Sequence, residues 1–171
     1  ISKDNSEPFY SSSKKIGILY NPVQLPFPSE KKISFLKKSL NILNQEFVIF
    51  FPGGSVLYEK GVFVFIKSLG ILKKKSPDLK FKFLIPGVLK KIKKRDKISQ
   101  KINKLIYDEE LEFNMIRVPF INTVEDYYSI SNLVVAPFIV PHFSRAVIES
   151  SVLGKPVIAS NLKIMKEVIE D

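Results

Sequence analysis

Residues 137–160 read Pro137-Phe-Ile-Val-Pro-His-Phe-Ser-Arg-Ala-Val-Ile-Glu149-Ser-Ser-Val-Leu-Gly154-Lys-Pro156-Val-Ile-Ala-Ser160. The apolar run 133–137 predicts a strand, residues 144–153 an amphipathic helix with Glu149 inside it, and residues 156–159 a second strand. The first turn of that helix, Phe143-Ser144-Arg145, directs backbone N–H groups and the positive end of the helix dipole beyond the first strand, which favours a diphosphate. Glu149 lies further along the helix, within reach of sugar hydroxyls. The pattern therefore predicts a phosphate and ribose site at the carboxyl edge of an α/β sheet.

Strands and helices alternate over the rest of the chain as well. Apolar residues between Val62 and Leu72 recur at helical spacing, whereas Phe81, Phe83 and Ile85 alternate as in a strand. Repeated strand and helix units predict a parallel sheet with right-handed crossovers and helices on both faces. The expected strands are 47–51, 80–85, 112–118, 133–137 and 156–159, and the expected helices are 61–75, 88–107, 123–131, 144–153 and 162–169.

The length of 171 residues, with 45% apolar content, suits one domain with a buried core. Residues 1–15 are polar and rich in serine, so we expect a linker or disordered segment there and the domain over residues 16–171. The longest apolar run, 133–141, falls short of the roughly 18 residues that a membrane span needs, and the start lacks a signal peptide's apolar core. We expect a cytoplasmic protein, with the inner face of the membrane as a second location.

Residue counts also limit the possible chemistry. The chain has no cysteine and a single histidine, His142, which excludes a disulfide framework, a thiolate metal site and a histidine metal cluster. The sequence therefore predicts no metal site.

Basic residues outnumber acidic ones, 27 to 17, giving a net charge of +10. They are densest at 90–97 and continue through Lys101 and Lys104. Three interpretations stay open. A solvated face is the first, since charge runs are commonly exposed. Attraction to an anionic membrane surface, worth about 1 kcal/mol for each cation, is the second. Nucleic-acid binding is the least favoured, because its usual module signatures are missing.

Three blocks of sequence carry a resemblance to a known family. Residues 132–171 resemble the donor-binding half of retaining, glycogen-synthase-like (group 1) GT-B glycosyltransferases, whose pattern contains an acidic residue, Pro-Phe-Gly, a short apolar run, Glu-Ala and Gly-x-Pro-Val-Ile-Ala. Residues 47–61, Phe47-Val-Ile-Phe-Phe-Pro-Gly-Gly54-Ser-Val-Leu-Tyr-Glu59-Lys60-Gly61, are similar to the family's strand, glycine turn and Lys-Gly helix start. Ile18-Leu-Tyr-Asn21-Pro is similar to the segment that follows the interdomain linker.

This resemblance implies a single Rossmann-like C-terminal domain whose N-terminal acceptor domain is missing from the sequence. It further implies a nucleoside diphosphate sugar as donor, a glycan or lipid-linked acceptor, and hexosyl transfer with retention of configuration. The family arrangement uses neither a cofactor nor a metal. Stabilising the leaving diphosphate is the electrostatic task that such a donor places on the domain.

The resemblance also assigns residues. It implies that Glu149 holds the ribose and that Lys60 holds the diphosphate, and these two are the expected catalytic residues. Bland alternatives remain open for both: Glu149 as a solvated carboxylate, and Lys60 as the start of a helix in water. The other expected donor-binding residues are Gly53, Gly54, Ser55, Arg117, Val118, Pro119, His142, Phe143, Ser144 and Arg145, with His142 also interpretable as an ordinary loop residue and the glycines as turn residues.

The sequence departs from the family pattern at two places. Pro141 stands where the family has the first glutamate of its Glu-x7-Glu pair, and Ser55 stands where relatives carry an arginine before the helix lysine. Arg145 or Arg117 is then a candidate for the missing charge. Two other functions also stay open: a non-catalytic nucleotide-binding module of the same fold, and a basic domain that meets membranes or other polyanions.

Overall fold

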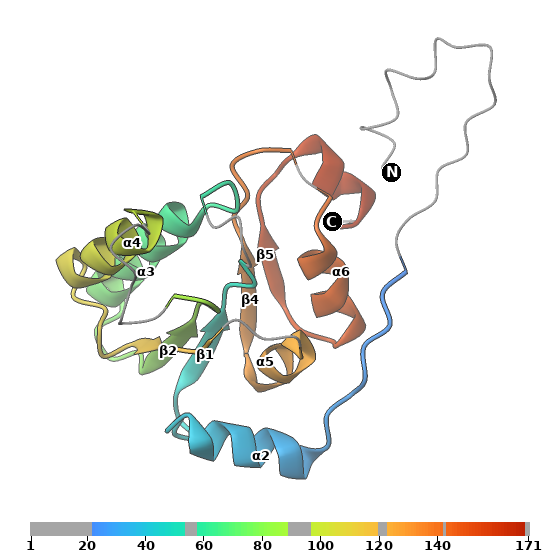
Figure 1. Cartoon of the computed structure of the whole chain (residues 1–171), viewed down its shortest axis with the longest axis horizontal. Coiled ribbons are helices and arrows are strands. Elements are labelled where there is room, and N and C mark those ends of the chain that lie inside the picture. The colour runs from blue at the N-terminus through green and yellow to red at the C-terminus, as the bar shows by residue number, and fades with distance from the viewer. Residues whose placement is uncertain (1–21, 54–57, 89–96, 120–122, 142, 170–171) are drawn as a thin grey trace.

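The computed structural model describes residues 22–53, 58–88, 97–119, 123–141 and 143–169 (Figure 1). Five parallel strands form one sheet in the order β3-β2-β1-β4-β5, which confirms the predicted parallel sheet. Sequence order thus runs outward from β1 in both directions, as in doubly wound α/β folds. The strands are β1 (Phe47–Phe50), β2 (Phe81–Leu84), β3 (Met115–Ile116), β4 (Leu133–Ala136) and β5 (Val157–Ala159).

Helices cover both faces of the sheet, because successive strand residues point to opposite sides. Ile49 of β1 and Phe83 of β2 pack in one cluster with α3 and α4, whereas Val48 and Phe50 pack in another with α5 and, less deeply, α2. Ala136 of β4 meets α6 on that second face. The helices are α2 (Glu30–Ser39), α3 (Val62–Lys75), α4 (Lys97–Asp108), α5 (Val124–Ile130) and α6 (Arg145–Val152), followed by the 3-10 helix η2 (Lys163–Glu167).

One side chain ties the two central strands together. The side-chain oxygen Oδ1 of Asn132, just before β4, accepts the N–H of Val48 at 2.8 Å, and the N–H of Asn132 donates to the carbonyl of Val48, also at 2.8 Å. Asn132 therefore satisfies both backbone groups of a buried β1 residue. This pairing fixes β4 beside β1 at the start of both strands.

Three predicted elements differ from the structure. The helix expected over 88–107 is α4, which covers Lys97–Asp108; Val88 lies in a turn, and residues 89–96 lie outside the described part. The strand expected over 112–118 pairs only at Met115–Ile116, since residues 112–114 form a turn. The last helix, expected over 162–169, is the short 3-10 helix η2 over Lys163–Glu167. In each case apolar residues mark burial correctly but do not fix the backbone hydrogen bonding.

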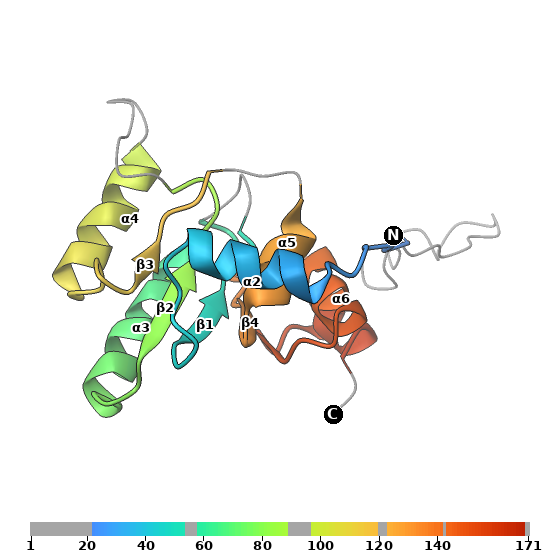
Figure 2. The same ribbon diagram turned by 90° about the horizontal axis from the view of Figure 1, so that it is seen from below.

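Helix α2 has no counterpart among the predicted elements. Ser29 caps it by accepting the N–H of Lys32 at 3.3 Å, and Ile33, Leu36 and Leu40 face the core. Figure 2 shows α2 in blue, crossing beside α5. An ion pair of 2.6 Å between Lys32 and Asp126 of α5 joins the two helices. The signal for this helix was present in the serine cap and the apolar spacing.

None of the described helices is both long and apolar enough to cross a bilayer. The expected linker at 1–15 and the family-like segment 18–22 fall outside the described residues, apart from Pro22.

Candidate functional site

The site lies where the strand order reverses, between β1 and β4. Loops leaving the carboxyl ends of these neighbouring strands run in opposite directions, one toward α3 and the other toward α6 (Figure 1). Ligands of open α/β sheets bind in the crevice that such loops create. Lys60 belongs to the first loop and Glu149 to the helix after the second. The topology therefore brings the two expected catalytic residues to the same edge of the sheet.

Backbone contacts join these two loops directly. The N–H of Ile139, after β4, donates to the carbonyl of Glu59 at 3.0 Å. Gly61 has a φ of 77°, and the carbonyl oxygen of Pro137 occupies the place that a Cβ of residue 61 would take. Only glycine fits both the left-handed backbone and this close approach. Gly61 is therefore needed for the contact between the loops, beyond the ordinary turn role.

The start of α6 has the geometry of an anion site. Ser144 is the N-cap, and its hydroxyl accepts the N–H of Val147 at 3.3 Å. The N–H groups of Arg145 and Ala146 have no partner within the helix, because the first turn lacks preceding carbonyls. Phe143 and Ser144 thus precede the helix instead of forming its first turn, a difference that leaves the direction of the helix dipole unchanged.

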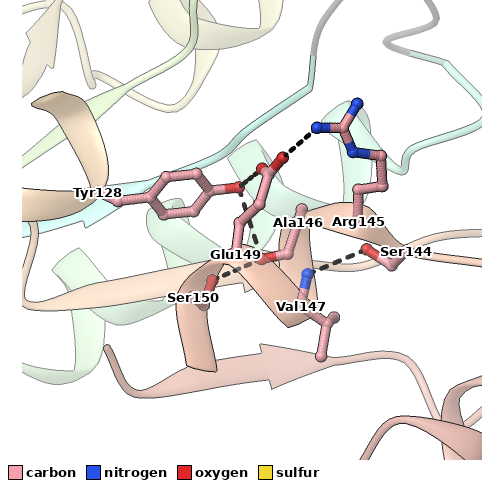
Figure 3. Close-up of polar contacts among 7 residues, drawn as sticks. All are labelled: Tyr128, Ser144, Arg145, Ala146, Val147, Glu149 and Ser150. Carbon is pink, nitrogen blue, oxygen red and sulfur yellow. Dashed lines mark hydrogen bonds and ion pairs between the residues drawn. The ribbon is translucent and has the colours of Figure 1, made fainter. Parts of the chain in front are cut away.

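Glu149 is a buried carboxylate, 7% exposed, and not the solvated helix residue of the alternative interpretation. Figure 3 shows that its two carboxylate oxygens have different partners. Oε2 accepts the hydroxyl hydrogen of Tyr128 at 2.9 Å, and Oε1 lies 3.1 Å from Nη2 of Arg145, one helical turn earlier. A buried carboxylate is costly unless it is paired in this way. The arrangement keeps a fixed negative group beside the helix start.

Lys60 lies in the turn before α3, whose cap is Gly61, so it does not begin the helix as expected. Its side chain is half-buried. Burial lowers the pKa of Lys60, and the nearby negative charge of Glu149 acts against that decrease. Lys60 is therefore within electrostatic range of Glu149. A partly desolvated cation just before the start of a helix gains from an anionic ligand.

Two predicted site residues after β3, Arg117 and Val118, make hydrogen bonds within the fold. Nη1 of Arg117 donates to Oδ1 of Asn103 on α4 at 2.7 Å, and burial lowers the pKa of Arg117, with Glu112 opposing that effect. Val118 is buried, and its carbonyl accepts the N–H of Gly87 at 3.0 Å. Pro119 is exposed. Two strands, β2 and β1, separate this segment from β4, so the fold does not bring it to Glu149.

Four further residues complete the comparison with the expected site. Gly53 is buried just after β1, where its N–H donates to the carbonyl of Phe51 at 2.8 Å. Gly54, Ser55 and His142 lie outside the described residues.

Tyr128 was missed by sequence reasoning, because a tyrosine on the apolar side of a helix indicates core packing and carries no sign of its polar partner.

An open parallel sheet in the order β3-β2-β1-β4-β5 with helices on both faces is a Rossmann-like α/β domain. The chain belongs to the group 1 glycosyltransferases: the sequence model described as "Glycosyl transferases group 1" matches residues 32–171. No curated protein sequence matches the chain significantly.

Solved structures resemble this fold at low sequence identity. A glycosyltransferase from Rickettsia africae ESF-5 has a TM-score of 0.71 and 22% identity over 84% of this chain and 36% of its own. Anabaena Alr3699/HepE, solved in complex with UDP-glucose, has a TM-score of 0.71 and 22% sequence identity, and the match covers 84% of this chain and 37% of its own. The C-terminal domain of a glycosyl transferase group 1 family protein (LpcC) from Francisella tularensis has a TM-score of 0.62 and 19% sequence identity, and the match covers 85% of this chain and 72% of its own. The chain thus spans little more than a third of the first two proteins.

The contact between the loops predicts a large effect of replacing Gly61. Gly61→Ala adds a Cβ that overlaps the Pro137 carbonyl and forces alanine into a left-handed conformation. We expect the free energy of unfolding to fall by about 2 kcal/mol or more, measured by urea denaturation.

Gly154→Ala is the matched control, because Gly154 has a similar φ of 63° but nothing within 4 Å of the added Cβ. It carries the conformational strain alone, about 1 kcal/mol. Equal losses for the two variants would show that the Gly61 contact with Pro137 contributes nothing.

Proposed function

We propose that this domain binds the nucleoside diphosphate sugar of a retaining group 1 glycosyltransferase and supports hexosyl transfer to a glycan or lipid-linked acceptor. One observation carries the proposal: the buried carboxylate of Glu149 lies beside the start of α6 and within electrostatic range of Lys60, at the switch point of the sheet. An anion site next to a fixed hydrogen-bond acceptor matches a ligand with a diphosphate and a ribose. Family membership supplies the reaction class.

The diphosphate is assigned to the start of α6 and to Lys60. Backbone N–H groups there, together with the segment Phe143 and Ser144, present donors that need no metal ion to attract phosphate oxygens. When the bond between the sugar and the diphosphate breaks, negative charge develops on the leaving oxygen. Groups already aimed at that charge lower the barrier without reorganising. Lys60 and the α6 start are placed to do this, and Glu149 receives a ribose hydroxyl.

Arg145 is the better candidate for the cation that Ser55 does not supply. Its side chain is largely exposed, and Arg145 is the first residue of α6, the helix to which we assign the diphosphate. Arg117, in contrast, is bonded to Asn103 and lies toward the far side of β2. Moving Arg117 would break a bond that supports α4, whereas the largely exposed Arg145 can leave Glu149 when a ribose hydroxyl takes its place at the buried carboxylate.

Two of the similar structures support the remaining parts of the proposal. Anabaena Alr3699/HepE was solved with UDP-glucose, which favours a nucleotide sugar as the ligand of this domain. The Francisella protein was solved as the C-terminal domain of a group 1 enzyme and matches this chain over 72% of its own length. We therefore assign this chain to the C-terminal half of a two-domain enzyme, with acceptor binding on the other half.

The proposal predicts nucleotide binding that depends on both charged residues. Calorimetric titration of the chain with UDP, GDP and ADP is expected to give selective binding of one of them. Lys60→Ala removes a charged contact to phosphate and Glu149→Gln weakens the ribose contact, so each is expected to raise the Kd about tenfold or more.

Lys67→Ala and Glu30→Gln are the matched controls, since both residues are exposed on helices away from the switch point. Their Kd values should stay within about twofold of wild type. Absence of binding for all three nucleotides, or equal effects of Lys60→Ala and Lys67→Ala, would contradict the proposed site.

The lowered pKa of Lys60 predicts a loss of affinity in alkaline solution. Only the protonated amine attracts the diphosphate, and burial makes this amine lose its proton at a lower pH than an exposed lysine. Affinity should therefore fall as the pH rises above the pKa of Lys60 in the free protein. Titrations from pH 7 upward, within the range where circular dichroism shows a folded chain, test this.

Lys60→Arg keeps its charge over the same range, so its affinity should change little with pH. If wild type and Lys60→Arg lost affinity in parallel, the titrating group would be another residue or the nucleotide base, and not Lys60.

A further inference from the structure

Tyr128 is held rigidly beside the carboxylate of Glu149 (Figure 3). Its side chain has no exposed surface, and its ring meets Phe50 of β1 edge-on, with the ring centroids 5.0 Å apart and the planes at 84°. Packing between α5 and the central strand therefore sets where the phenol oxygen lies. The oxygen cannot follow a ligand or a mobile side chain.

The phenol donates to one oxygen of Glu149 in particular. Its distance to Oε2 is 2.9 Å, whereas the carbonyl of Ala146 lies at 3.5 Å and competes weakly. Burial, the negative charge of Glu149 and the hydrogen bond itself all raise the pKa of Tyr128. The phenol therefore keeps its hydrogen throughout the neutral range, and Oε2 stays occupied.

The second oxygen of Glu149 has a different kind of partner. Oε1 pairs with Nη2 of Arg145 at 3.1 Å, and the side chain of Arg145 is 61% exposed. Because Arg145 reaches Oε1 from solvent, a ligand hydroxyl can take its place, provided that the buried carboxylate keeps a partner. Arg145 is also the first residue of α6, so a guanidinium that leaves Oε1 stays near the first-turn N–H groups. The two oxygens thus differ, because Oε2 is bonded to a buried phenol whereas Oε1 is paired with a guanidinium that reaches it from solvent.

We infer that Tyr128 is a positioning residue for nucleotide recognition, which orients the carboxylate of Glu149 so that Oε1 accepts a ribose hydroxyl once Arg145 turns from Oε1 to the diphosphate. The inference rests on the proposed function and adds to it the atom that meets the ribose and the residue that aims it. Tyr128 itself touches no part of the nucleotide. Its effect is confined to the hydroxyl groups that Glu149 receives.

The test compares ribonucleotides with analogues that lack the ribose hydroxyls. Wild type, Tyr128→Phe and Tyr127→Phe are titrated with whichever of UDP, GDP and ADP the wild type binds, and with its 2′,3′-dideoxy counterpart. Tyr127 is the matched control, because it neighbours Tyr128 on α5, is also buried and packs on Phe50 with ring centroids 6.1 Å apart. Tyr128→Phe should weaken the ribonucleotide about tenfold and the dideoxy analogue less than about twofold.

Tyr127→Phe should retain the wild-type preference for the ribonucleotide. Equal weakening of both ligands by Tyr128→Phe would show a structural role alone and overturn the inference, as would no weakening of either. If the wild type binds no nucleotide, the proposed function fails and the inference fails with it. Wild-type binding with a uniform loss in Tyr128→Phe contradicts the inference only.

Arg145→Ala provides a second test that does not disturb the buried phenol. It removes the residue that covers Oε1 and a cation for the diphosphate, so both ligands should bind more weakly while the preference for the ribonucleotide is kept or increased. A lost preference in Arg145→Ala would place Arg145, and not Oε1 of Glu149, at the ribose. This result would also overturn the inference.

Discussion

The close approach of the Gly61 backbone to the Pro137 carbonyl holds the two halves of the candidate site together. β1 and β4 diverge into loops that lead to opposite faces of the sheet, and without a contact between those loops Lys60 and the start of α6 would be positioned independently. The hydrogen bond between Ile139 and Glu59 reinforces the contact. Because a Cβ at position 61 would overlap the Pro137 carbonyl, this one glycine permits the close approach of the two loops.

Charge is then arranged around that contact at considerable energetic cost. A carboxylate and an amine are both partly removed from water within one small region, and each relies on partners for compensation. The cost of burying Glu149 is offset by a buried phenol and an exposed guanidinium. The contact with the phenol is permanent, and the contact with the guanidinium is exchangeable. Sites that bind charged ligands gain from this asymmetry, because the permanent half orients the group and the exchangeable half yields to the ligand.

The sequence predicted the alternation of strands and helices, the parallel sheet and the place of Glu149 on a helix after the strand 133–137, since apolar periodicity reports burial directly. It did not predict α2, although a serine cap and apolar spacing mark that helix, or the short extent of β3. The bond of Arg117 to Asn103 was not predicted, because a position after a strand says nothing of which helix covers that strand. Tyr128 was missed because its partner lies 21 residues away, a pairing that only the folded arrangement of α5 and α6 on the sheet creates.

The most direct measurement of the central claim is a crystal structure of the full chain soaked with the nucleoside diphosphate that binds it. We expect the diphosphate at the start of α6 with Lys60 against it, and a ribose hydroxyl on Oε1 of Glu149 in place of Arg145. A nucleotide bound elsewhere, for example along the basic residues of α4, with the pair of Glu149 and Arg145 unchanged, would contradict this claim.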